Sequence, residues 1–258
     1  MDLKLQEKVA IITGASRGIG RGIAQSLANE GCHLVICARG EDALMDTAKA
    51  LSASGGSVKP VVVDLLDDGA ADCLVSAALK DFGRLDILVG NAGNNRRGLF
   101  ADTTDDDWAA VMDLNFSAHA RCARAAIPAI RDSGGGSIIF ISSIFGREAG
   151  GRGLSIYNTS KSALISLAKI MALELGQDGI RVNTVAPGSI RFEGGSWDRR
   201  CKEDPEWMKA FVENNLPMGR FGMIEEVADV VTFIASPRAS WISGACINVD
   251  GVQSRSLI

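Results

Sequence analysis

The chain has 258 residues, of which 47% are hydrophobic and 22% are charged. This length suits one large α/β domain, and the composition is too apolar for a disordered chain. Because 31 acidic residues outnumber 27 basic ones, for a net charge of −4, the sequence does not favour a nucleic-acid binder, which usually carries a basic excess.

The N-terminus and the cysteines bear on the compartment. The first eight residues contain no apolar segment of a signal peptide, and no run approaches the roughly 18 apolar residues of a membrane span. The six cysteines form no Cys-x-x-Cys pair and no Cys/His cluster with zinc spacing. We therefore expect a cytoplasmic protein with reduced thiols that binds no metal, no membrane and no nucleic acid.

Short apolar runs that predict β-strands alternate along the chain with stretches that predict helices. Strands are expected at 9–12, 34–37, 61–63, 87–89, 138–141, 182–185 and 246–249, and helices at 18–30, 41–53, 67–82, 105–132, 155–176 and 225–236. The alternation predicts a single α/β domain over 1–258, a doubly wound, Rossmann-like sheet of seven parallel strands with helices on both faces. Segment 189–220 interrupts it and holds Trp197 and Trp207, which suggests a lid over a substrate site.

The first predicted strand ends in a glycine-rich turn that opens the first helix. Gly14, Gly18 and Gly20 remove side chains where the chain turns and where a pyrophosphate approaches the backbone. The helix N-terminus adds free N–H groups. Because the pattern follows a strand and precedes a helix, it predicts a dinucleotide site rather than a simple tight turn.

The second strand ends without the acid that NAD-binding folds place against the ribose 2′-hydroxyl, since position 38 is Ala. Arg39 follows it, and Arg17 lies inside the glycine turn. Two guanidinium groups can bind a 2′-phosphate. The preferred cofactor is therefore predicted to be NADP(H), with NAD(H) possible; the alternative is two solvated surface arginines.

The helix predicted over 155–176 carries Tyr157, the one tyrosine, and Lys161 four residues later, on the same face. A free phenol has a pKa of about 10, and a nearby cation favours the phenolate. Lys161 together with an oxidised nicotinamide therefore predicts a lowered pKa for Tyr157, which would act as a general acid or base. The helix is apolar nearly all round, which predicts that a partner covers one side.

Together these motifs resemble the short-chain dehydrogenase/reductase family, in its branch of chains of this length, over roughly residues 5–251. The resemblance is carried by Thr13-Gly14-x-x-x-Gly18-x-Gly20, Asp64, Asn91-Ala92-Gly93, Asn115, Ser143, Tyr157-x-x-x-Lys161 and Pro187-Gly188. It implies an oxidoreductase similar to 3-oxoacyl-thioester reductases and related alcohol dehydrogenases, acting on a small carbonyl or alcohol. It also implies a homotetramer paired through 105–132 and 155–176.

The resemblance further implies roles for individual residues. Ser143, favoured over Ser142 by its distance to Gly146, holds the substrate oxygen. Tyr157 is the general acid or base, and Lys161 holds the nicotinamide ribose. Asn115 holds a water in a proton relay, or alternatively bonds to its own helix backbone. The implied cofactor contacts are Gly14, Ser16, Arg17, Gly18, Ile19, Gly20, Arg39, Asp64, Leu65, Asn91, Ala92, Gly93, Tyr157, Lys161, Pro187, Gly188 and Ile190.

Some positions depart from the family pattern, and some alternatives stay open. Gly90 stands where Asn is frequent, and no Thr follows Pro187-Gly188 to bind the carboxamide. Four arginines lie in segments near the expected site: Arg96, Arg97, Arg147 and Arg152. They could bind an anionic group of the substrate, but we favour the alternative that they are surface charges. Four alternative functions stay open: a non-catalytic NADPH sensor, an NAD(H)-preferring polyol or cyclic alcohol dehydrogenase, a methyltransferase and a nucleotide-sugar epimerase. The intact Ser143, Tyr157 and Lys161 argue against a sensor.

Overall fold

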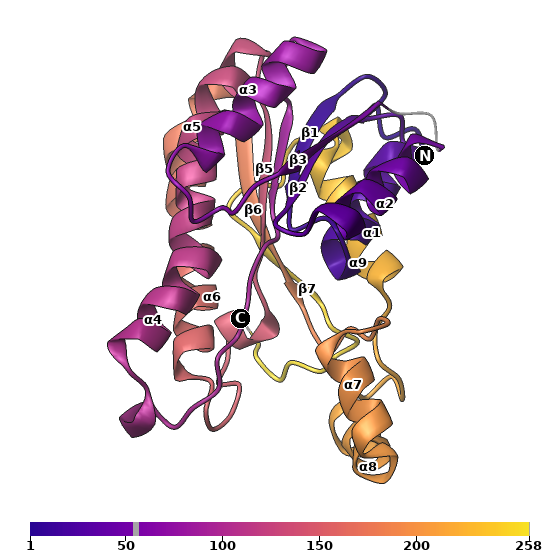
Figure 1. Cartoon of the computed structure of the whole chain (residues 1–258), viewed down its shortest axis with the longest axis vertical. Coiled ribbons are helices and arrows are strands. Elements are labelled where there is room, and N and C mark those ends of the chain that lie inside the picture. Colours follow the sequence, from indigo (N-terminus) through magenta and orange to yellow (C-terminus); the bar gives the residue numbers. More distant parts are fainter. Residues whose placement is uncertain (54–56, 258) are drawn as a thin grey trace.

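The computed structural model describes residues 1–53 and 57–257. Its strands form one sheet in the order β3-β2-β1-β4-β5-β6-β7 (Figure 1). Every neighbouring pair runs parallel. The strands are β1 (Val9–Thr13), β2 (His33–Ala38), β3 (Val58–Val62), β4 (Ile87–Gly90), β5 (Gly136–Ile141), β6 (Ile180–Pro187) and β7 (Cys246–Val249). The predicted doubly wound parallel α/β fold is confirmed.

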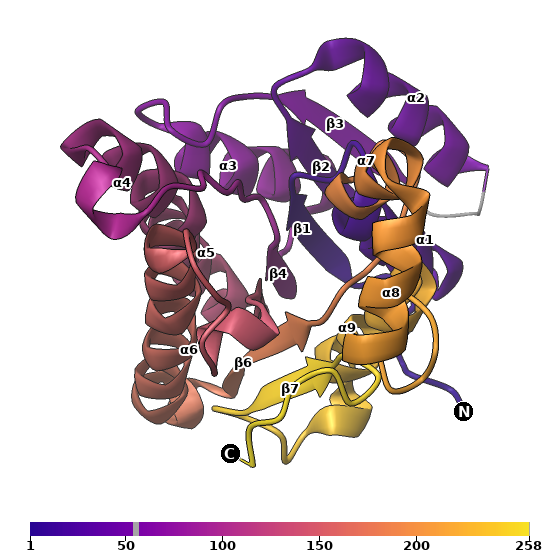
Figure 2. The same cartoon turned by 90° about the horizontal axis from the view of Figure 1, so that it is seen from below.

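Helices cover both faces of the sheet (Figures 1 and 2). One face carries α1 (Gly18–Asn29), α2 (Glu41–Ser52) and α9 (Ile224–Ala235), and the other carries α3 (Ala70–Phe82), α5 (Ala118–Asp132) and α6 (Ser155–Leu175). The helix α4 (Asp105–Met112) packs on α6. The apolar strands explain the two layers. In β1, Ala10 and Ile12 belong to one hydrophobic core, and Val9 and Ile11 belong to the core on the opposite face. A strand with apolar side chains on both sides is stable only between two layers of helices.

Two predicted elements differ from the structure for local reasons. β3 spans Val58–Val62 rather than 61–63 and includes Pro60, because β3 is an edge strand and an edge position tolerates a missing N–H. The helix predicted over 105–132 is interrupted between α4 and α5 by a π-helical turn, η2 (Asp113–Ser117). Short 3₁₀ helices complete the chain: η1 (Phe100–Asp102), η3 (Ile144–Gly146), η4 (Gly176–Asp178) and η5 (Pro237–Ala239).

The segment 189–220 folds into two helices, α7 (Ser196–Glu203) and α8 (Pro205–Asn215). Asp204 caps α8 by accepting a 3.0 Å hydrogen bond from the backbone N–H of Trp207, and Pro205 occupies the first turn, where its missing N–H costs nothing. The Trp197 and Phe211 rings stack with centroids 4.9 Å apart. The two helices stand beyond the sheet, across from α4 (Figure 1).

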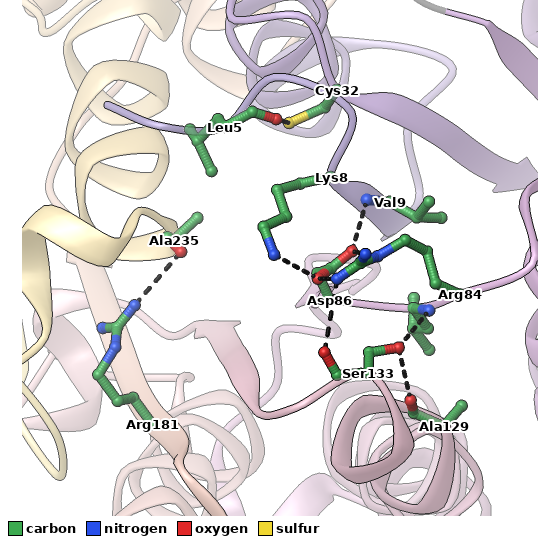
Figure 3. Close-up of polar contacts among 11 residues, drawn as sticks. Leu5, Lys8, Val9, Cys32, Arg84, Asp86, Ala129, Ser133, Arg181 and Ala235 are labelled. Carbon is green, nitrogen blue, oxygen red and sulfur yellow. Dashed lines mark hydrogen bonds and ion pairs between the residues drawn. The ribbon is translucent and has the colours of Figure 1, made fainter. Parts of the chain in front are cut away.

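The amino-terminal ends of β1 and β4 are joined through the buried carboxylate of Asp86 (Figure 3). This carboxylate accepts hydrogen bonds from the backbone N–H of Val9 at 3.0 Å, the ammonium of Lys8 at 2.9 Å and the guanidinium of Arg84 at 2.6 Å. Burial raises the pKa of Asp86, but these three donors outweigh it, and the net pKa lies below the ordinary value. The anchor therefore holds together the two strands at which the strand order reverses.

All six cysteines carry free thiols. Burial raises the pKa of Cys32 and of Cys37 to about 12, which makes these two thiols unreactive. In residues 1–53 and 57–257, no helix is long and apolar enough to cross a bilayer. The same residues contain no cluster of three or more His, Cys, Asp or Glu side chains that could hold a metal ion.

Candidate active site

Two adjoining cavities open at the carboxyl ends of the strands, where doubly wound sheets bind ligands. The first, of about 550 Å³, lies between the glycine turn and the ends of β2 and β3. The second, of about 510 Å³, contains Ser143, Tyr157 and Lys161. Ile19, Asn91, Gly93 and Phe192 line both cavities. The residues predicted for the cofactor and those predicted for catalysis therefore meet in one cleft.

The floor of the cleft is built by hydrogen bonds between the turns after β1 and β4. The Thr13 hydroxyl accepts from the N–H groups of Asn91 and Ala92 at 2.9 and 3.1 Å. The Asn91 side chain donates back to the carbonyls of Thr13 and Gly14 at 2.9 and 3.1 Å. A Cβ on Gly20 would collide with the Asn91 amide and the Gly14 carbonyl. Glycine is therefore required at position 20 by the packing of the two turns.

The far end of the first cavity presents Arg17 and Arg39. The Arg39 guanidinium is 72% exposed and lies 3.5 Å from a carboxylate oxygen of Asp64. The other Asp64 oxygen accepts a hydrogen bond from the N–H of Leu66 at 3.0 Å. Arg17 makes no ion pair within the described part of the chain. The far end of this cavity therefore carries two guanidiniums and the carboxylate of Asp64.

Ile190, a predicted cofactor contact, follows Ser189 of the second cavity but does not itself line either cavity of the cleft. Its side chain is 5% exposed and belongs to the core on the α9 face of the sheet. A parallel bridge to Gly222 sets this direction, because Arg191 donates to the Gly222 carbonyl and Gly222 donates to the Ser189 carbonyl, both at 3.0 Å. A Cβ on Gly222 would lie 2.5 Å from the Ile190 Cδ1. The Ile190 side chain is therefore part of the core packing.

Asn115 is buried in the π-helical turn and holds the loop after β4. Its amide nitrogen donates to the Asn94 carbonyl at 2.9 Å and to the Ser160 hydroxyl at 3.0 Å. Its oxygen accepts from the Asn94 N–H at 2.8 Å. The alternative that Asn115 bonds to its own helix is therefore wrong. The side chain instead links the loop after β4 to Ser160 on α6, which lies three residues after Tyr157.

Burial controls the charges of Tyr157 and Lys161. The Lys161 ammonium donates to the Ile141 carbonyl at 2.8 Å and lies 5.9 Å from the centroid of the Tyr157 ring. Burial lowers the pKa of Lys161 to about 8. Burial also raises the pKa of Tyr157, and an interaction with the Ser143 hydroxyl only partly opposes it. In the protein alone the pKa of Tyr157 is therefore not lowered as expected, because the loss of water around the phenol outweighs the hydrogen bond with Ser143.

The two consecutive serines after β5 have different surroundings. The Ser142 hydroxyl is committed to the backbone, donating to the Lys161 carbonyl at 2.9 Å. The Ser143 hydroxyl accepts from the Phe145 N–H at 3.2 Å and interacts with Tyr157. Ser143 is therefore the serine whose hydroxyl is directed toward the phenol.

His119 is a residue of this region that the sequence analysis did not single out. It is buried, and its Nε2 donates to the Ala92 carbonyl at 2.7 Å. Burial lowers the pKa of His119 to about 3, so the imidazole stays neutral. A Cβ at Gly90 would lie 2.9 Å from its Nδ1 and 2.8 Å from Phe140. Gly90, where the family frequently has Asn, is the feature of the sequence that could have indicated a buried ring here, because a glycine makes room for the His119 imidazole.

Only one of the arginines that flank the site in sequence lines the second cavity, and it is Arg97. Arg96 instead bonds to Asp107 at 2.8 Å, and Arg147 bonds to Asn248 at 2.7 Å. Arg97 is exposed and also lines this cavity, so it is the one of the four arginines whose position fits both interpretations. The second cavity also receives residues that no motif indicated: Phe145, Leu154 and Arg200.

Several known proteins are similar to this chain in sequence and in fold. A family model described as Enoyl-(Acyl carrier protein) reductase matches residues 14–251. The Short-chain reductase protein NovJ of Streptomyces niveus is 34% identical over 247 residues, covering 95% of this chain and 94% of that protein. The 3-oxoacyl-(acyl-carrier-protein) reductase FabG of Escherichia coli is 33% identical over 249 residues, covering 96% and 98%. The structure of L-sorbose reductase from Gluconobacter frateurii complexed with NADPH and L-sorbose superposes with a TM-score of 0.94 at 35% identity, covering 100% of both chains.

The fold, the cleft and these relatives define an oxidoreductase that acts on alcohol or carbonyl groups. The chain belongs to the short-chain dehydrogenase/reductase family, as the sequence resemblance predicted.

Proposed function

We propose that the protein transfers a hydride between NADP(H) and a small carbonyl compound or secondary alcohol, with Tyr157 as the proton donor or acceptor. The observation that carries the proposal is the convergence of Ser143, Tyr157 and Lys161 in one cavity that adjoins the glycine-turn cavity. These groups come from the end of β5 and from the first turns of α6. A substrate oxygen placed between the Ser143 and Tyr157 hydroxyls would meet both donors.

When bound, the nicotinamide supplies or accepts the hydride. The Ser143 hydroxyl donates a hydrogen bond to the substrate oxygen and stabilises the negative charge that develops there. Tyr157 gives its proton to that oxygen in reduction and removes it in oxidation. The raised pKa of Tyr157 supports the acid role, because the phenol then holds its proton at neutral pH. The Lys161 ammonium, fixed to the Ile141 carbonyl, stabilises the phenolate after transfer.

Asn115 has a positioning role in the proposed site. Its side chain fixes the Asn94 backbone and the Ser160 hydroxyl, and a Cβ on Gly93 would lie 3.1 Å from the Asn115 oxygen and 3.5 Å from the Lys161 ammonium. Both amide hydrogens of Asn115 are used by these contacts, and its oxygen also accepts from the Asn94 N–H. We propose that the remaining acceptor position on this oxygen holds a water that returns the proton from solvent toward Lys161.

The proposed preference for NADP(H) rests on Arg17 and Arg39 at the far end of the first cavity. Two cations there favour a 2′-phosphate, whereas NAD(H) carries none. Asp64, which pairs with Arg39, is the group that limits this preference. That the L-sorbose reductase relative was solved with NADPH supports the same cofactor. The remaining proposed cofactor contacts line the cleft, from Asp64 and Leu65 at one end to Pro187 and Gly188 at the other.

The decisive experiment compares the wild type with the Tyr157→Phe variant on a panel of ketones and secondary alcohols, followed by the absorbance of the reduced nicotinamide. Loss of the phenol is expected to lower kcat by about 10²- to 10⁴-fold while the Kd for NADPH stays unchanged. Undiminished turnover in Y157F would remove Tyr157 from the mechanism. A wild type that binds NADPH and turns over none of the panel would instead favour a sensor.

We also propose a homotetramer that pairs through α4, α5 and α6. On α6, Ile170 is 51% exposed and Leu173 is 72% exposed, which supports a partner for this apolar face. Light scattering is expected to give four times the mass of one chain, and a monodisperse monomer would contradict the proposal.

We further propose that the protein is located in the cytoplasm. Its free thiols support a reducing compartment.

The helices α7 and α8 are proposed to act as the substrate lid. Phe192, which precedes them, packs on the glycine turn: a Cβ on Gly18 would lie 2.7 Å from its ring. Trp197 on α7 lines the second cavity. The lid thus contacts both parts of the cleft through aromatic side chains.

A further inference from the structure

The second cavity, of about 510 Å³, is here called the substrate cavity. The charged residues that line it are Arg97, Lys161 and Arg200, and its lining contains no Asp or Glu. Lys161 already donates to the Ile141 carbonyl at 2.8 Å. Two guanidinium groups therefore face this cavity without a carboxylate beside them.

Arg97 lies in the loop after β4 and is not used by the fold. Within the described ranges its guanidinium makes no ion pair and no hydrogen bond. Its neighbour Arg96 differs, because it pairs with Asp107 at 2.8 Å and does not line the substrate cavity. Two consecutive arginines therefore have separate roles, and only the second faces the cavity.

Arg200, on α7 of the proposed lid, likewise lines the cavity while the arginine next to it does not. Its guanidinium carbon lies 4.9 Å from the centroid of the Trp197 ring, and stacking of this kind leaves the N–H groups at the edge of the guanidinium free to donate. Its neighbour Arg199 donates to the Gly194 carbonyl at 2.8 Å and does not line the cavity. The nearby carboxylate of Asp198 is not available to Arg200, because Arg191 and Lys202 occupy it.

The two guanidiniums are close enough to influence each other. Arg97 is exposed overall, but its partial burial lowers its pKa, and the positive charge of Arg200 lowers it further. Arg97 precedes α4 in the chain and Arg200 lies on α7, and these two helices flank the carboxyl ends of the strands (Figure 2). Like charges that converge on a cavity without a counter-ion are unfavourable alone, and a bound anion relieves the repulsion.

We propose that the substrate cavity takes an anionic alcohol or carbonyl compound, whose carboxylate or phosphate group is held by Arg97 and Arg200 while its reacting oxygen meets Ser143 and Tyr157. This inference rests on the proposed function and adds the charge class of the substrate. The planar, forked N–H groups of two arginines match either anion. The substrate class is therefore hydroxy or oxo acids, or phosphorylated hydroxy or oxo compounds.

The test uses pairs of substrates that differ only in the anionic group. Acetoacetate is compared with methyl acetoacetate, and dihydroxyacetone phosphate with dihydroxyacetone, at saturating NADPH. The wild type is expected to prefer the anionic member of at least one pair by about 10-fold or more in kcat/KM. Arg97→Gln and Arg200→Gln are each expected to lower kcat/KM for that anion by about 10- to 100-fold, the usual cost of losing a charged hydrogen bond. The neutral member should change little.

Matched controls are the adjacent arginines. Arg96→Gln and Arg199→Gln remove the same charge from the same segments but leave the cavity lining intact, so they should keep the preference for the anion. The pair of substrates that discriminates identifies a carboxylate or a phosphate as the recognised group. An equal preference for neutral compounds in the wild type, or an unchanged preference in both R97Q and R200Q, would overturn the proposal.

Binding measurements separate this proposal from the catalytic one. Malonate and inorganic phosphate are titrated by calorimetry into the NADPH-loaded Tyr157→Phe protein, which lacks the phenol but keeps both arginines. Binding of either anion, lost in the Y157F/R97Q double variant, supports the subsite whatever the turnover. If R97Q and R200Q instead weaken NADPH binding and leave the anion titration unchanged, the arginines serve the cofactor phosphates and the inference is wrong.

Discussion

The ammonium of Lys161 on α6 donates a 2.8 Å hydrogen bond to the carbonyl of Ile141, the last residue of β5. The charge next to Tyr157 is therefore tied to the sheet rather than left on a mobile side chain. A buried ammonium costs stability, and the lowered pKa of Lys161 reports that cost. The arrangement keeps a destabilising charge at the position where the proposed proton transfer uses it.

Replacing Lys161 should show, through the pH dependence of the free energy of unfolding, how much its buried charge destabilises the protein. The pKa of Lys161 is lowered from 10.5 to about 8, so the unfolded chain holds the proton more strongly than the folded one. The penalty is complete below pH 8 and fades as the pH rises toward 10.5. The advantage of Lys161→Met over wild type in free energy of unfolding should therefore shrink by about 3 kcal/mol between these limits. Urea titrations at both ends measure it, and a constant difference would contradict the buried charge.

His119 should make the free energy of unfolding depend on pH on the acid side, whereas Lys161 acts on the alkaline side. Its pKa falls from 6.5 to about 3 in the folded protein, so the unfolded state gains a proton below pH 6.5 while the folded state does not. Stability from the neutral ring is complete above pH 6.5 and is lost as the pH falls. Relative to His119→Gln, the wild type should lose about 2 kcal/mol of unfolding free energy between pH 6.5 and 5. Denaturant unfolding at the two pH values checks this, and parallel profiles for the two proteins would speak against it.

Gly20 should be intolerant of even one methyl group. Gly20→Ala places a Cβ against the Asn91 amide and the Gly14 carbonyl, so the turns after β1 and β4 must separate. We expect a loss of about 1–3 kcal/mol in stability together with weaker NADPH binding. Gly176→Ala is the matched control, since its φ of −59° is helical and nothing lies within 4 Å of the added Cβ. That variant should be neutral or more stable by about 0.4–1 kcal/mol; equal thermal shifts in both variants would remove the steric explanation.

Arg39 should control the choice between the two nicotinamide cofactors. Arg39→Asp removes a cation from the first cavity and places a carboxylate beside Asp64, which repels a 2′-phosphate. The ratio of kcat/KM for NADPH to that for NADH is expected to fall by at least about tenfold, the effect of one lost charged hydrogen bond. Folding should change little, because Arg39 is 72% exposed and its ion pair with Asp64 is screened by solvent. An unchanged cofactor ratio would remove Arg39 from the proposed 2′-phosphate site.

Most of the cleft could be predicted because its residues follow strands. In a parallel sheet all carboxyl ends lie at one edge, so Gly14 after β1, Asn91 after β4 and Ser143 after β5 are brought together by the fold class alone. The helical spacing of Tyr157 and Lys161 is likewise local. The direction of the Ile190 side chain could not be predicted in this way, because a bridge to Gly222, 32 positions away, turns it into the core.

Local patterns were enough to predict the fold class and the family, which are confirmed, and to select the side chains proposed for catalysis, since hydrophobic alternation, turn glycines and helical spacing act over a few residues. Folding alone settled the direction of the Tyr157 pKa shift, the π-helical turn at Asn115 and the choice of Arg97 over Arg96 as the arginine that faces the cavity. These properties depend on how much water surrounds a group and on charges far away in the chain. Arg200, on the lid, meets the loop after β4 only once the sheet has placed both at its carboxyl edge.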